Sequence, residues 1–133
     1  MSTPRFRFLV HGERLAIARL SQDAPVPTWA RGRFVNIART PAELSIVCAQ
    51  VHVPRETVHE RDKIALGIEG TIAMTSIGIL AALCGALASA GVPVFVISTY
   101  DTDWLLVSAD RMQAATKALE AAGHEVQGST PAQ

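Results

Sequence analysis

The amino-acid sequence predicts a mixed α/β fold of the α+β kind, in which helices cover one side of an antiparallel sheet. Two patterns in residues 63–126 support this prediction. Short runs of alternating or β-branched apolar residues have the period of strands, and two longer stretches repeat apolar residues every three or four positions, as helices do. In chain order these patterns predict a strand, a helix, two strands, a helix and a strand.

The amino-terminal part of the chain is predicted to consist of strands. Phe6–Val10 and Leu15–Leu20 flank the sequence HGER, a glycine-containing turn, and this arrangement predicts a hairpin. A second hairpin is predicted from residues 34–38 and 44–48, which enclose the turn-forming RTPAE. Residues 53–61 follow as a short helical or irregular connection.

The second half contains both predicted helices. A strand over 64–69 leads to a helix that starts near Ser76, and a β-branched strand over 92–97 is followed by a hairpin and the second helix. Gly123 should end that second helix. Helical spacing predicts that six side chains face the sheet: Leu80, Leu83, Leu87, Met112, Ala115 and Leu119.

A family resemblance is carried by two sequence runs, SIGILAAL at 76–83 and GVPVFVISTYDTDWLLV at 91–107. Both resemble the small, two-lobed bacterial ACT-domain proteins, and the same signature occurs in the arginine-sensing Castor proteins. The resemblance implies a ferredoxin-like ACT fold with a βαββαβ second lobe. The expected division is an incomplete ACT-like lobe over 1–60, an ACT domain over 61–128 and a disordered tail over 129–133.

The resemblance also implies a function, because ACT domains bind amino acids or similar small ligands and usually pair their sheets side by side. We therefore expect a non-catalytic regulatory or sensor module with an amino acid as its ligand. Unpaired sheet edges favour a homodimer. Two alternatives remain open: a small enzyme or enzyme subunit that uses the same cleft, and a protein-interaction module that uses a sheet edge.

The first group of candidate ligand-binding residues lies at the start of the first helix. Backbone N–H groups around Ile77 and Gly78 would suit a carboxylate, and Thr75 or Ser76 could cap the helix. Glycine costs a helix about 0.5 to 1 kcal/mol relative to alanine, so Gly78 is consistent with a ligand close to the backbone. Ordinary helix packing is the alternative.

The second group comprises Ser98, Thr99 and Asp103, where polar side chains follow an apolar strand. Asp103 matches the aspartate of the family hairpin I-S-T-[YF]-x-x-D, and it could bind an α-ammonium or a cationic side chain. Turn stabilisation is the alternative for Asp103 and is favoured for Asp101. The arginine-sensing relatives have an acidic residue where Ser76 stands, which argues against arginine as the ligand.

Other classes of function have little support in the sequence. The 133 residues carry a formal net charge of +0 with scattered arginines, so no nucleic-acid footprint is expected. The chain lacks GxSxG, P-loop and GxGxxG motifs, and its four histidines do not form HxxxH, so neither a cofactor nor a metal is expected.

The cysteines and the hydropathy of the chain bear on its cellular location. Cys48 and Cys84 occur without a CxxC motif or a signal peptide, which predicts reduced thiols and a cytoplasmic protein. The uncharged stretch between Gly70 and Tyr100 has the length of a membrane span. Gly91 and Pro93 interrupt it, so no membrane insertion is expected.

Overall fold

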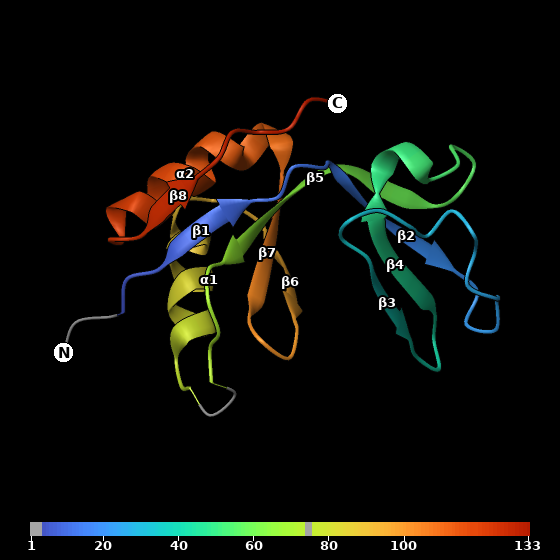
Figure 1. Cartoon of the computed structure of the whole chain (residues 1–133), viewed down its shortest axis with the longest axis horizontal. Helices are drawn as coiled ribbons and strands as arrows, with labels where there is room; N and C mark the ends of the chain where they lie inside the picture. Colours follow the sequence, from blue (N-terminus) through green and yellow to red (C-terminus); the bar gives the residue numbers. More distant parts are fainter. Residues whose placement is uncertain (1–3, 74–75) are drawn as a thin grey trace. The chain divides into compact units, whose positions relative to one another are not determined.

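The computed structural model describes residues 4–73 and 76–133 and divides the chain into two compact units (Figure 1). The helical unit comprises Met1–His11 and Ile64–Thr130, and the strand unit comprises Gly12–Lys63 and Pro131–Gln133. In the part of the chain that is described, no helix is long and apolar enough to cross a membrane.

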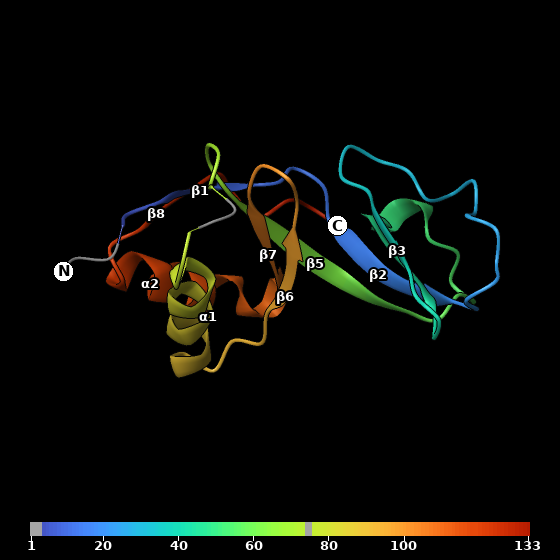
Figure 2. The ribbon, with the colours of Figure 1, turned by 90° about the horizontal axis from the view of Figure 1, so that it is seen from below.

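The helical unit holds the predicted βαββαβ sequence of elements. Its strands are ordered β8-β1-β5-β7-β6, and α1 and α2 contact each other (Figure 2). The elements are β1 (Arg7–Val10), β5 (His59–Ile68, of which 64–68 belong to this unit), α1 (Ile79–Ser89), β6 (Phe95–Ser98), β7 (Asp103–Ser108), the 3-10 turn η2 (Ala109–Arg111), α2 (Met112–Ala121) and β8 (Glu125–Gln127). The predicted α/β architecture, with a mostly antiparallel sheet and two helices, is confirmed.

The first predicted hairpin was wrong. Strand β1 pairs antiparallel with β5 and parallel with β8, with Phe8 opposite Ile68 on one side and Val126 on the other. Strand β2 (Leu15–Leu20) pairs instead with β4 and the first part of β5. The alternating apolar residues of the two segments and the turn between them favour a hairpin. Phe8, however, is 0% exposed, and it is buried between strands that are distant in sequence.

The helix faces agree with the predicted spacing. Leu83, Leu87, Ala115 and Leu119 are fully buried or nearly so, Met112 is buried, and Leu80 packs partly buried against the same core. This core also contains apolar side chains of β1, β5 and β7. The two helices therefore bury their apolar stripes against one sheet.

Both helices end at a glycine with positive φ. Gly123, at φ 97°, follows α2; its N–H donates to the carbonyl of Glu120, and the N–H of His124 donates to the carbonyl of Leu119. Gly91, at φ 73°, follows α1 with the same pattern of two hydrogen bonds. These are Schellman motifs, for which glycine is favoured because it adopts the left-handed conformation without strain. The predicted stop at Gly123 is confirmed.

His124 connects the end of α2 to the amino-terminal segment. The backbone N–H of Phe6 donates to His124 Nδ1 at 3.0 Å, so the imidazole is neutral and carries its proton on Nε2. The ring stacks on Phe6 and meets the edge of Phe8. Burial lowers the pKa of His124 below its ordinary value of 6.5.

The free energy of unfolding of the helical unit is expected to fall as the pH drops below about 6.5. The unfolded chain then binds a proton at His124 that the folded chain resists, so the contribution of neutral His124 is complete above that pH and is lost on acidification. Urea unfolding at pH 7.5 and 5.0 would measure the change. The variant His124→Asn keeps an acceptor near Nδ1 without titrating, and an unchanged pH dependence in this variant would contradict the prediction.

The strand unit contains β2, β3 (Asn36–Arg39), β4 (Leu44–Ala49) and residues 59–63 of β5, with the 3-10 turn η1 (Gln50–His52) after β4. Strands β3 and β4 pair antiparallel, which confirms the second predicted hairpin. The predicted connection over 53–61 was partly wrong, because β5 already begins at His59. That segment carries charged residues with little apolar alternation, and pairing with β2 makes it a strand.

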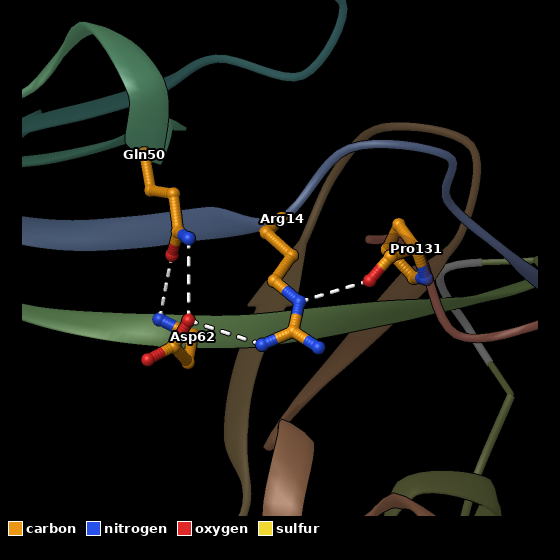
Figure 3. A network of polar contacts seen from close by, with 4 residues as sticks. All are labelled: Arg14, Gln50, Asp62 and Pro131. Carbon is orange, nitrogen blue, oxygen red and sulfur yellow. Dashed lines mark hydrogen bonds and ion pairs between the residues drawn. The ribbon is translucent and has the colours of Figure 1, made fainter. Parts of the chain in front are cut away.

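A polar network surrounds an irregularity in β5 (Figure 3). Asp62 has φ 60°, and its backbone N–H donates to Gln50 Oε1 at 2.7 Å. The Asp62 carboxylate accepts hydrogen bonds from Gln50 Nε2 and Arg14 Nη1, and these bonds lower its pKa. Arg14 Nε also donates to the Pro131 carbonyl at 2.9 Å, which gives a defined partner to the tail predicted to be disordered.

Candidate ligand pocket

A pocket of about 480 Å³ lies in the helical unit, between the segment that enters α1 and the β6–β7 hairpin. Its volume is in the range of small-molecule sites, about 300–1,000 Å³. The described lining residues are Ile72, Ala73, Ser76, Gly78, Ile79, Leu80, Ala81, Ser98, Thr99, Tyr100, Thr102 and Asp103.

The amino-terminal end of α1 differs from the predicted one. The helix begins at Ile79 and Gly78 is its N-cap, with φ 81° and no side-chain hydrogen bond to cap it. The predicted capping by Ser76 was therefore wrong, and Thr75 lies outside the described residues. The Ser76 N–H instead donates to the carbonyl of Ala73 in a turn. Glycine at 78 makes the later start feasible, because the chain enters α1 through a left-handed residue.

This helix end presents backbone donors to the pocket. The N–H of Ala82 donates to the Gly78 carbonyl at 3.0 Å, which is the first turn of the helix. The three preceding amides, of Ile79, Leu80 and Ala81, have no carbonyl within the helix to which they can donate. All three residues line the pocket. Such amides and the helix dipole favour an anion at this position.

The β6–β7 hairpin supplies the polar wall. Ser98 and Asp103 are opposite each other in the strand register, and Ser98 Oγ donates to Asp103 Oδ1 at 2.6 Å. The Thr99 hydroxyl donates to the carbonyl of Thr102 at 3.1 Å. Asp103 is the only charged side chain among the described lining residues. The wall therefore combines one carboxylate with the hydroxyls of Ser98 and Thr99, whose hydrogens are already bonded within the hairpin.

Five of the predicted residues line this pocket together: Ser76, Gly78, Ser98, Thr99 and Asp103. Ile77 does not line it, and its side chain is 96% exposed. Asp101 acts through its backbone, since its carbonyl accepts the N–H of Ile72 at 2.7 Å and holds the loop against the hairpin.

Sequence reasoning missed the aliphatic part of the pocket wall, which includes Ile72 and Ile79. Neither isoleucine carries a chemical group that marks a ligand site. Ile72 follows the first strand of the predicted unit in an irregular segment, and Ile79 has the spacing of an ordinary helix residue. Tyr100, the aromatic position of the family hairpin I-S-T-[YF]-x-x-D, also lines the pocket and is 82% exposed.

A family model described as an ACT domain matches residues 58–121, which include most of the helical unit and the whole pocket. A second model, for an amino-terminal domain, matches residues 13–56 in the strand unit. A search of curated proteins gave no significant match.

Several solved structures are similar to the chain. Protein Atu0741 from Agobacterium tumefaciens is 32% identical, with 98% of this chain and 99% of that chain covered and a TM-score of 0.90. The ligand-free regulatory subunit of aspartate kinase from Thermus thermophilus is 13% identical, with coverage of 86% and 97% and a TM-score of 0.61. Aspartate kinase from Synechocystis is 14% identical, with coverage of 95% and 28% and a TM-score of 0.62. The two kinase likenesses show a shared fold.

Proposed function

Because this chain belongs to the ACT-domain proteins, we propose that it is a non-catalytic regulatory module that binds an amino acid in the pocket between α1 and the β6–β7 hairpin. Similarity of fold to the regulatory subunit of an aspartate kinase supports a regulatory role. The observation that carries the proposal is the pairing of opposite electrostatic features in one pocket. The end of α1 favours an anion, and Asp103 favours a cation.

An α-amino acid carries both charges on adjacent atoms. In the proposed complex, its carboxylate accepts hydrogen bonds from the backbone amides of Ile79, Leu80 and Ala81. Its ammonium donates to Asp103, whose second carboxylate oxygen has no partner among the described residues. The Ser98 hydroxyl orients Asp103 through the bond to Oδ1. Charge-assisted hydrogen bonds of this kind are stronger than neutral ones.

Two variants at one position test the carboxylate contact. Gly78→Asp is expected to bind its amino-acid ligand at least about tenfold more weakly than Gly78→Asn, because the added carboxylate repels that of the ligand. The two side chains have nearly the same shape and tolerate the left-handed backbone of Gly78 similarly. An added Cβ at this position meets nothing within 4 Å, so the cost of either variant is the strain of the left-handed backbone and not a steric clash.

Thermal-shift screening of the twenty amino acids would identify the ligand, and calorimetry would give the affinities of both variants. Urea unfolding is the control for equal stability. Equal affinities in the two folded variants would place the ligand away from the end of α1.

We also propose that the protein forms a homodimer through a sheet edge. In the described part of the chain, β6 pairs only with β7, so its second edge has no strand partner. Phe95 on this strand is 40% exposed. Exposed edges of this kind are sites of strand pairing.

Light scattering at micromolar concentrations should give the mass of a dimer. Phe95→Lys should shift the protein toward monomer by placing a charge on the edge strand. Leu9→Lys is a matched control, because Leu9 is also 40% exposed but lies on β1, which has partners on both sides. Monomer mass for the unaltered chain would refute the proposal.

A further inference from the structure

We infer that the pocket selects an amino acid whose side chain is uncharged and apolar; this inference rests on the ligand site proposed above. The inference depends on the lining residues that do not bind the α-carboxylate or the α-ammonium of the ligand. Three properties of that remainder decide the side-chain class: its charge, its free hydrogen-bond donors and its apolar surface.

The first property is charge. Asp103 is the only charged side chain among the described lining residues, and in the proposed complex its carboxylate already binds the ammonium of the ligand. Met74 and Thr75, the neighbours in sequence that the structure does not describe, are uncharged residue types. A ligand with a second charge of either sign would lose hydration without gaining a counter-charge, which is strongly unfavourable.

The second property is the state of the hydroxyl groups. The Ser98 hydroxyl donates to Asp103, and that of Thr99 donates to the Thr102 carbonyl. The Thr102 hydroxyl donates to the carbonyl of Ile68 at 3.1 Å. The hydrogens of these three hydroxyls are thus committed to the hairpin and its neighbouring strand, and the other two hydroxyls of the described lining belong to the exposed residues Ser76 and Tyr100. A polar ligand side chain would give up hydrogen bonds to water and find few donors in return.

The third property is an apolar surface beside these groups. Ile72, Ile79 and Leu80 are partly buried and pack against the core of the helical unit. All three also line the pocket, so their accessible parts are open to a ligand. An aliphatic side chain that covers them removes apolar surface from water on both partners. Charge, hydrogen bonding and apolar burial therefore favour the same class of ligand.

Matched pairs of amino acids test this inference by calorimetry with the full chain. Valine and threonine have nearly the same shape and differ in one methyl for one hydroxyl. Leucine and aspartate, and norleucine and lysine, differ mainly in charge at similar size. We expect the apolar member of each pair to bind at least about tenfold more tightly, since an unpaired hydroxyl or charge weakens binding by that factor or more.

The variant Asp103→Asn locates the preference in this pocket. This variant should weaken the binding of valine and the binding of threonine by the same factor, about tenfold, because Asp103 contacts the ammonium group that both ligands have. Tighter binding of threonine, aspartate or lysine would overturn the inference and leave the proposed amino-acid site intact. Binding of none of the six would overturn the proposed function and the inference together. Apolar preference without any effect of Asp103→Asn would place the site elsewhere and also overturn the inference.

Discussion

Replacing Phe8 by alanine is expected to lower the free energy of unfolding of the helical unit by about 3–5 kcal/mol. Phe8 is 0% exposed and lies on β1, between β5 and β8. Its ring meets the edge of the His124 imidazole. Truncation leaves a cavity beside β1. This strand joins β8 to the rest of the sheet, because β8 has no other partner strand in the described chain.

Tryptophan fluorescence can follow this unit by itself. The chain contains two tryptophans, Trp29 in the strand unit and Trp104 in the helical unit, so Trp29→Phe leaves one reporter. In that background Leu9→Ala is the matched control. Leu9 is the next residue on β1 and is 40% exposed, so its truncation should change the free energy of unfolding by less than about 1 kcal/mol. Similar effects of the two substitutions would contradict the insertion of β1.

Replacing Gly67 by alanine is expected to destabilise the same unit by about 1–3 kcal/mol through overpacking. Gly67 is buried on β5, and an added Cβ would lie 2.5, 2.7 and 2.8 Å from three ring carbons of Trp104 on β7. These distances are shorter than van der Waals contact, so the indole ring would have to move. Glycine at 67 is therefore required by the close approach of a side chain from the neighbouring strand.

A double variant identifies the cause. Trp104→Leu removes the ring atoms that the new methyl group would meet, so Gly67→Ala should cost much less in that background. Urea unfolding followed by circular dichroism would measure all four proteins of this cycle. Additive effects would show that Gly67 has another role, such as a backbone preference of the strand.

Part of the candidate pocket could be predicted because it depends on short segments. Ser98 and Asp103 come from one hairpin, and the turn between its strands places them opposite each other. Gly78 and Ser76 come from the segment that enters α1. The bonded state of the hydroxyls could not be predicted, because the Thr102 hydroxyl reaches the carbonyl of Ile68 on another strand.

The sequence by itself determined the elements whose signals are local. Apolar spacing defines the buried faces of both helices, and Gly91 and Gly123 end them because their positive φ values are favourable for glycine. The β3–β4 hairpin follows from two neighbouring apolar runs around a proline-containing turn. Each of these features depends on residues close together along the chain.

Only the tertiary structure decided the position of β1 and the apolar wall of the pocket. A strand with alternating apolar residues can pair with any suitable edge, and burial of Phe8 against residues far along the chain selected β5 and β8 over the adjacent β2. Ile72 and Ile79 become pocket residues because the hairpin folds beside α1. The physical reason is the same in both cases: hydrophobic burial depends on which surfaces meet in three dimensions, and local sequence does not specify the distant partner.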